Sequence, residues 1–195
     1  MSKIFYIMGK SASGKDHIFE DVLKDPKLNL RRLVLYTTRP IRSGETEGET
    51  YYFTDEEHLR ELRDAGKIIE ERCYQTIHGP WYYFTADEGQ FETEEDFLGI
   101  GTLESYGVLR KYFGKEKMVP LYIEVEDGLR LKRAIAREEK QETPKYKELC
   151  RRFLADCEDF SEEKILEQEI TERISNDRTL EECLQQVKQV IFASK

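Results

Sequence analysis

Two stretches of this chain contain residues whose types and spacing suit the binding of phosphate. The first is Gly9-Lys10-Ser11-Ala12-Ser13-Gly14-Lys15, which fits the pattern G-x-x-x-x-G-K. Glycines let such a loop turn tightly, so that its N–H groups point at phosphate oxygens, and the lysine adds a point charge. An apolar run precedes the loop and a helical pattern follows it, as a phosphate-binding loop requires. We therefore predict a nucleoside triphosphate site here.

The residue after this loop is Asp16, where serine or threonine is usual. The usual hydroxyl contacts Mg²⁺, and a carboxylate is also a hard oxygen donor suited to that ion. A carboxylate nevertheless brings negative charge to a site where the nucleotide is already negative. The position predicts Asp16 as a metal ligand and raises the question of what chemistry the loop performs.

The second stretch is "YTTRPIRSGETEGETYYF", residues 36 to 53. Arg39 and Arg42 are three residues apart, a spacing at which two guanidinium groups can converge on one phosphate. Tyr51 can add a phenolic donor. The alternative is a β-hairpin with a charged turn, which Pro40 and the glycines would also suit. Two anion sites in one small domain favour phosphoryl transfer, because the donor and acceptor phosphates must be held close and in line.

The order of the expected elements predicts the fold class that would position these residues. Apolar runs of strand length recur at residues 4–8, 33–36, 97–100 and 119–125, with helical patterns between most of them. This alternation predicts an α/β fold with a parallel central sheet. Capping-box spacing predicts helices that begin after Thr54 and after Thr179. Residues 127–170 are heavily charged and helical in pattern, and predict either a solvated helical pair or a mobile lid.

Composition limits the classes of partner. The 195 residues are 38% hydrophobic and 36% charged, and their net charge of −9 argues against a nucleic-acid polymer as partner. No apolar run approaches the length of a membrane helix, and the first one is too short for a signal peptide, so we expect a cytoplasmic protein. The four cysteines form no C-x-x-C pair and are expected to be reduced thiols.

Five motifs together resemble the guanylate kinase family. They are the phosphate loop, "TTRPIRSGETEGETYYF", "GKIIEE", "WYYFT" and "ISND", in the family's order and at matching separations over nearly the whole chain. The resemblance implies a P-loop kinase fold, with helices flanking the sheet, a small mixed β lobe for GMP and a helical lid. It divides the single domain into a core (1–34, 92–126 and 171–195), an acceptor-binding lobe (35–91) and a lid (127–170).

The resemblance also implies roles for individual residues and a reaction. Arg39, Arg42, Tyr51 and Tyr83 would hold the GMP phosphate, with Glu45 in the same motif, while Glu70 and Thr85 would face the guanine edge. Arg137 and Arg152 fall where the family's lid supplies arginines to the transferring phosphates, although Arg133 could take the place of Arg137. Asn176 would lie beside the adenine of ATP. The implied reaction is transfer of the γ-phosphoryl group of ATP to GMP with Mg²⁺, in a monomer or homodimer, with Lys15, Arg39, Arg137 and Arg152 as catalytic residues.

The sequence departs from the family at four positions. Leu35 stands where the family has a serine that helps to recognise guanine, and Gly99 and Gly101 stand where it has two aspartates. With Asp16 as the fourth change, one hypothesis is that this carboxylate restores negative charge lost at the two glycines. These departures leave two alternatives open. One is a kinase of another phosphorylated acceptor, such as ribose 1,5-bisphosphate or a different nucleotide, and the other is a non-catalytic binding module that resembles guanylate kinases.

Overall fold

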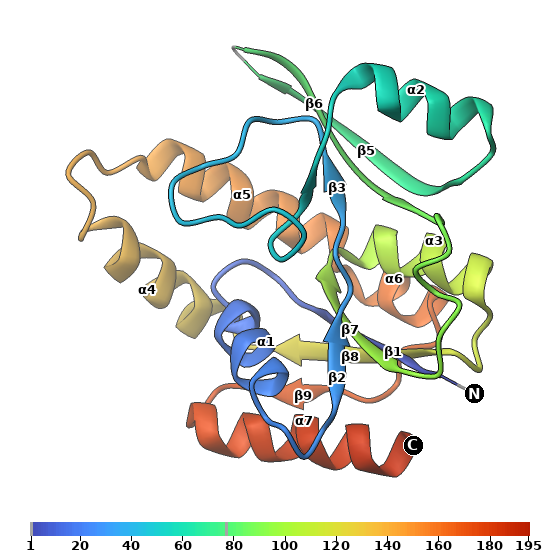
Figure 1. Ribbon diagram of the computed structural model, residues 1–195. Helices are drawn as coiled ribbons and strands as arrows, with labels where there is room; N and C mark the ends of the chain where they lie inside the picture. The colour runs from blue at the N-terminus through green and yellow to red at the C-terminus, as the bar shows by residue number, and fades with distance from the viewer. Residues whose placement is uncertain (1, 77) are drawn as a thin grey trace.

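The computed structural model describes residues 2–76 and 78–195, and its centre is a five-stranded parallel sheet (Figure 1). The strand order is β2-β7-β1-β8-β9. The strands are β1 (Ile4–Met8), β2 (Leu30–Arg32), β7 (Asp96–Gly101), β8 (Met118–Glu124) and β9 (Ile174–Ser175). All pairs are parallel. The predicted α/β class with a parallel central sheet is confirmed.

Helices cover both faces of this sheet, and β1 supplies alternate side chains to each face. Phe5 and Ile7 pack among side chains of α1 (Lys15–Leu23) and α7 (Leu180–Ser194). Ile4, Tyr6 and Met8 pack on the other face, among side chains of α3 (Leu103–Phe113) and α6 (Glu162–Glu167). All five residues of β1 are fully buried, as expected of a central parallel strand. The phosphate loop thus begins at the end of the most buried strand.

A second, smaller sheet lies above the first in Figure 1. Its order is β4-β3-β6-β5, formed by β4 (Tyr52–Phe53), β3 (Tyr36–Thr37), β6 (Gly79–Ala86) and β5 (Ile68–Thr76). β3 pairs parallel with β4 and antiparallel with β6, which makes the sheet mixed, as predicted. One face is covered by α2 (Glu56–Asp64), whose Leu59 and Leu62 pack on Phe84. The opposite face is left to line a site.

Two further helices, α4 (Asp127–Glu138) and α5 (Tyr146–Asp159), form an arm at the left of Figure 1. Arg130 of α4 is fully buried between them and lies over the ring of Phe153. α5 buries no side chain completely, whereas α6 after it sends Ile165 into the core. Among the described residues, no helix combines the length and apolar character that a membrane span needs.

Two local predictions were wrong, and each has a physical reason. The strand expected at residues 33–36 is replaced by a buried link, because β2 ends at Arg32 and β3 begins at Tyr36, so the apolar run joins two sheets. The N-cap of α2 is Asp55 rather than Thr54, since the Asp55 carboxylate accepts from the His58 N–H at 2.9 Å. The Thr179 cap of α7 was predicted correctly.

Candidate active site

The phosphate loop has the backbone that its sequence demands. Gly14 is in the left-handed region at φ 86° and precedes α1, whose N-terminus therefore opens onto the loop. Ala12 also has positive φ, at 64°. A Cβ on Gly9 would lie 2.5 Å from the carbonyl oxygen of Ile123 in β8, so only glycine fits between the strands there. The loop is held in a strained, pre-formed shape suited to an anion.

Asn176 holds the backbone of this loop through a hydrogen bond. It is 5% exposed, and its side-chain amide donates to the carbonyl oxygen of Ser13 at 2.8 Å. A Cβ on Gly14 would come within 2.6 Å of the same amide nitrogen. Arg133, in turn, donates to the carbonyl oxygen of Asn176 at 2.9 Å. Asn176 therefore positions the loop backbone, in addition to the adenine contact that the resemblance implies.

Lys15 and Asp16 stand at the mouth of the loop. The Lys15 ammonium lies 3.7 Å from the Asp16 carboxylate, and the Asp16 side chain is 80% exposed. Lys10 is held away from the loop centre by Asp127, at 3.2 Å. Within the part of the chain that the structure describes, no three His, Cys, Asp or Glu side chains gather as a metal cluster. A metal here would need phosphate oxygens to complete its ligands.

The α4–α5 arm contacts the phosphate loop directly. The Ser11 N–H donates to the Asp156 carboxylate of α5 at 2.8 Å, so one of the loop's N–H groups is already bonded to an anionic side chain. Arg130 donates to Asp156 at 3.2 Å and to Asp127 at 2.9 Å. Arg152 reaches the Ser11 hydroxyl at 3.3 Å. The α4–α5 arm and the phosphate loop are therefore close enough for arm side chains to contact phosphates bound on the loop.

The two arm arginines differ in their surroundings. Arg137 is exposed on α4 and borders a cavity of about 160 Å³ together with Arg152 and Ser11. Arg152 also borders the larger cleft described below, whereas Arg137 does not. Arg133 is engaged by Asn176 and is therefore less available than Arg137. A neighbour on α5, Arg151, borders the larger cleft as well and was not predicted.

Arg39 is the centre of the second predicted anion site. It is 4% exposed and forms a two-pronged ion pair with Glu45, at 2.7 and 2.5 Å. Its Nε donates to the Tyr83 hydroxyl at 3.0 Å, and Nη1 donates to the Pro40 carbonyl. Four donated bonds leave one of the five guanidinium N–H groups for a ligand. The guanidinium lowers the pKa of the Glu45 carboxyl from 4.5 to about 2.

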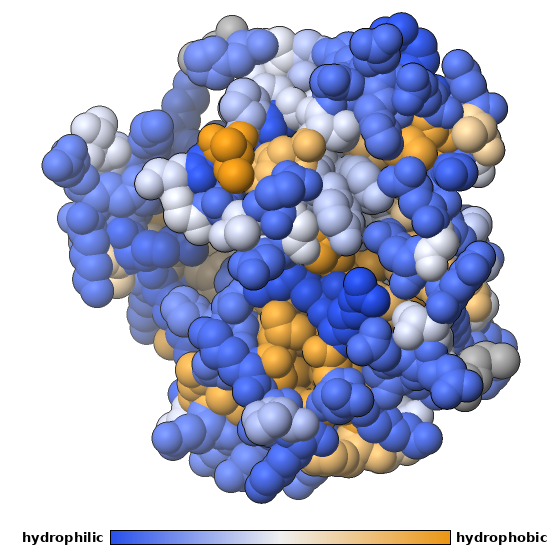
Figure 2. Space-filling model, viewed as in Figure 1, coloured by the Kyte–Doolittle hydropathy of each residue, from blue (hydrophilic) through white to orange (hydrophobic). Residues whose placement is uncertain are grey.

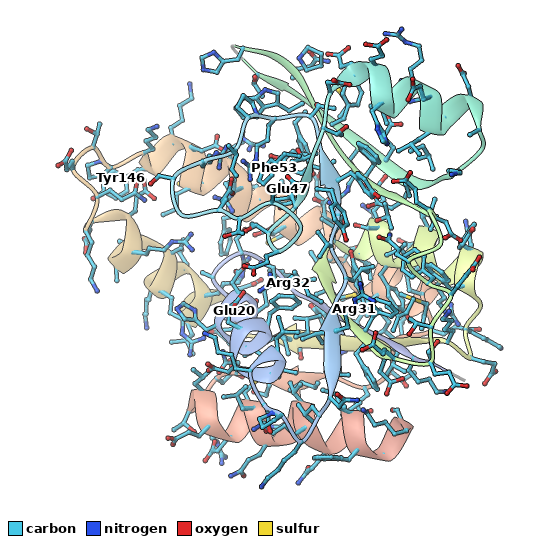
Figure 3. All side chains as sticks on the ribbon, in the orientation of Figure 1. Glu20, Arg31, Arg32, Glu47, Phe53 and Tyr146 are labelled. Carbon is cyan, nitrogen blue, oxygen red and sulfur yellow. The ribbon has the colours of Figure 1, made fainter. Side chains whose placement is uncertain are left out.

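Aromatic rings surround the Arg39 guanidinium. It lies 5.1 Å from the Tyr51 ring centroid and 6.0 Å from that of Tyr83, and burial raises the pKa of Tyr51. Arg42 is exposed and lies 5.8 Å from the Trp81 ring. Two further arginines, Arg31 and Arg32, precede this stretch in the sequence and lie on β2 of the parallel sheet. Figure 3 shows Arg32 of β2 beside Glu20 of α1, to which it donates at 2.7 Å.

A cleft of about 700 Å³ joins the three parts of the molecule. Its wall includes Lys15 and Asp16 from the phosphate loop, Tyr51 and Tyr83 from the small sheet, and Arg152 from the arm. Arg39, Arg42, Glu70 and Thr85 do not border it. Figure 2 shows a mainly hydrophilic face, with apolar side chains gathered below the small sheet. A separate groove of about 400 Å³ lies there, with Leu23, Leu30 and Tyr52 among its lining residues.

Comparisons with known proteins show similarity to guanylate kinases. Residues 1–88 match the family model described as guanylate kinase. Curated guanylate kinases from Aromatoleum aromaticum and Porphyromonas gingivalis are 38% and 30% identical, over 80 and 117 residues. The alignments cover 40% and 58% of this chain.

The chain is therefore similar to guanylate kinases, and the family model matches less than half of its length. It spans only 37% and 61% of the length of those two relatives. A crystal structure of guanylate kinase from Anaplasma phagocytophilum superposes with a TM-score of 0.62, over 98% of this chain and 85% of that one, at 21% identity. At that identity the likeness describes the fold.

In this structure the two residues predicted to contact guanine lie together, but Arg72 covers them. Glu70 of β5 faces Thr85 of β6 across the sheet, and the Thr85 hydroxyl donates to the Glu70 carboxylate at 3.1 Å. Arg72, two residues along the same face, donates to both carboxylate oxygens at 3.1 and 3.3 Å. Arg72 borders the cleft and Glu70 does not. Sequence analysis missed Arg72, although the i, i+2 spacing of Glu70 and Arg72 in a strand could have indicated it.

The two family positions occupied by glycine have a packing explanation. A Cβ on Gly99 would lie 2.7 Å from the Tyr6 ring and 2.9 Å from Leu33. A Cβ on Gly101 would lie 3.0 Å from Tyr6 Cζ and closer still to its hydroxyl oxygen. Burial raises the pKa of Tyr6 to about 12, and within the described chain the hydroxyl finds no hydrogen-bond partner. The Tyr6 ring fills the space that side chains at both positions would need.

Proposed function

We propose that this protein transfers the γ-phosphoryl group of ATP to GMP, giving ADP and GDP. One observation carries the proposal: the phosphate loop and the tyrosines beside Arg39 border the same cleft. A donor phosphate on Lys15 and an acceptor phosphate near Tyr51 and Tyr83 would then share one cleft. In-line phosphoryl transfer needs that proximity and little covalent chemistry from the protein.

ATP would bind with its phosphates on the loop amides and Lys15. Its β- and γ-phosphates would compete with the Asp156 carboxylate for the Ser11 N–H, because both are anions that accept from the same donor. Release of Asp156 would free the α4–α5 arm to close over the nucleotide. Arg152, already 3.3 Å from the Ser11 hydroxyl, would then neutralise charge on the transferring group.

Asp16 fits the expected contribution to Mg²⁺ binding. Its carboxylate is exposed and borders the cleft, and among the described residues its ion-pair contact is the one with Lys15 at 3.7 Å. Mg²⁺ is commonly held by one or two carboxylates together with substrate phosphates and water. When bound, the ion would neutralise charge on the donor phosphates. Lys15 would remain on the phosphates and Asp16 would orient the ion.

GMP would place its phosphate near the Tyr51 and Tyr83 hydroxyls and the free N–H of Arg39. Its base would face Glu70 and Thr85, since a carboxylate suits the adjacent N1–H and 2-amino donors of guanine. The exposed Arg42 would join the phosphate when the small sheet moves toward the core. No residue is required as a nucleophile, because the GMP phosphate attacks directly.

The test is the steady-state rate of ADP release from Mg²⁺-ATP with a panel of acceptors. GMP, AMP, IMP, ribose 5-phosphate and ribose 1,5-bisphosphate would be compared at equal concentrations. The proposal expects GMP to give the highest kcat/KM. Turnover with another acceptor and none with GMP would contradict it, and so would phosphate-dependent binding without any turnover.

One observation favours a second candidate, a kinase for a phosphorylated acceptor without guanine. The Arg72 guanidinium neutralises Glu70 and borders the cleft in its place. An arginine there would suit a second phosphate better than it suits a base edge. The same panel decides between the candidates, since ribose 1,5-bisphosphate carries that second phosphate.

A further inference from the structure

The Glu70–Arg72 pair lies where the acceptor base would have to bind. Cross-strand pairing puts Glu70 opposite Thr85 and Arg72 opposite Tyr83 on one face of the small sheet. The Glu70 side chain is 2% exposed and that of Arg72 is 17% exposed. Arg72 therefore covers the carboxylate and meets the cleft itself.

The hydrogen bonds of this pair match those expected from guanine. Arg72 Nε donates to Oε2 and Nη2 donates to Oε1, so two parallel N–H groups in one plane meet the carboxylate. Guanine presents N1–H and the 2-amino group in the same side-by-side arrangement. Each oxygen of Glu70 already has a donor from Arg72, and one also accepts from Thr85. Guanine and Arg72 cannot both occupy the carboxylate in this way.

We infer that Arg72 is a specificity-determining residue that occupies the base-edge site in the acceptor-free protein and must be displaced by the acceptor base. The inference rests on the proposed function and deepens it. A ligand that supplies two adjacent donors replaces both bonds that Glu70 loses. A ligand without a base leaves Arg72 in place and gains nothing from Glu70, so recognition depends on the exchange.

The displaced guanidinium has favourable surroundings. Burial by itself would lower the pKa of Arg72, but Glu70 and the nearby Tyr6 and Tyr74 favour the charged form, and the net result is a raised pKa. Arg72 already borders the cleft, so a change of side-chain torsion brings it to solvent without movement of β5. The exchange costs affinity, because the bonds between Arg72 and Glu70 must break before GMP can form its own.

The test compares dissociation constants for GMP and ribose 5-phosphate, measured by titration calorimetry on the full chain. Arg72→Ala and Arg72→Met remove the competing donors, and Met retains much of the side-chain volume if the alanine variant folds poorly. We expect GMP to bind about tenfold more tightly to either variant, because the ion pair between Arg72 and Glu70 no longer competes with the ligand. Ribose 5-phosphate, which never reaches Glu70, should bind unchanged.

Arg63→Ala is the matched control. Arg63 forms an equivalent two-pronged pair with Glu71, the residue between Glu70 and Arg72, on the opposite face of β5. Its removal should leave the binding of both ligands unchanged. Weaker or unchanged GMP binding in both Arg72 variants would overturn the inference. Absence of GMP turnover in the unmodified protein would instead refute the proposed function, so the two failures are distinguishable.

Discussion

The packing of Tyr6 against Gly101 gives a prediction whose size can be worked out from the structure. Gly101→Ala places a Cβ 3.0 Å from Tyr6 Cζ and closer to the hydroxyl oxygen. Tyr6 is fully buried in β1 between β7 and β8, so it cannot move aside cheaply. Overpacking of this kind costs about 1–3 kcal/mol, offset by about 0.4–1 kcal/mol because alanine restricts the unfolded chain.

We therefore expect Gly101→Ala to lower the free energy of unfolding by about 1–2 kcal/mol. In a chain of this length that corresponds to a melting temperature lower by roughly 2–8 °C. Tyr6→Phe removes the buried, unpartnered oxygen and should leave stability unchanged or raise it by about 1 kcal/mol. In the Tyr6→Phe background, Gly101→Ala should lower the free energy of unfolding by less, with a coupling energy of about 1 kcal/mol between the two substitutions.

Urea denaturation of the two single variants and the double variant measures this coupling. Gly107→Ala is the control, because the three heavy atoms nearest its Cβ all belong to the flexible end of Gln168, and alanine favours the helix. Equal stability of Gly101→Ala and the unmodified protein would refute the packing argument. So would a cost that is the same with and without the Tyr6 hydroxyl.

Three further predictions concern the site. Lys15→Met should lower kcat about a hundredfold or more, measured by ADP release, because it removes the positive charge that would meet the donor phosphates. The melting temperature should not change, and unchanged turnover would contradict the role of Lys15. The depressed pKa of Glu45 means that its pairing with Arg39 stabilises the fold fully above pH 4.5 and is lost as the pH falls towards 2. Urea midpoints of Glu45→Gln should therefore lack this part of the acid dependence, and identical profiles would argue against the pair. Arg130→Met should destabilise by about 2 kcal/mol in thermal unfolding, since Asp156 loses its buried partner, with Arg151→Met as the neutral exposed control.

Sequence patterns predicted the fold well where one element carries one signal. The apolar run before Gly9 became the central strand, and the spacing at Thr179 gave the correct N-cap. The run at 33–36 failed because an apolar link between two sheets is buried as deeply as a strand. Burial produces the same residue types in both cases, so the pattern alone cannot separate them.

The candidate site could be predicted only as a set of residues. The resemblance to guanylate kinases implied that Glu70 and Thr85 face the same ligand. Which ligand reaches them depends on Arg72, whose position follows only from the register of β5. Likewise, the glycines at 99 and 101 look like lost aspartates in the sequence. Their reason is the ring of Tyr6, far away along the chain, and only three-dimensional packing brings it there. The assigned roles and the division into core, lobe and lid stay predictions.

We propose that ATP and GMP share one cleft between the phosphate loop and the small sheet. An adenosine and a guanosine joined through five phosphates would span both sites, so its binding tests whether the two sites adjoin. We predict that one molecule binds per chain and competes with ATP and with GMP in steady-state kinetics. Competition with ATP alone, with GMP binding unaffected, would contradict the account.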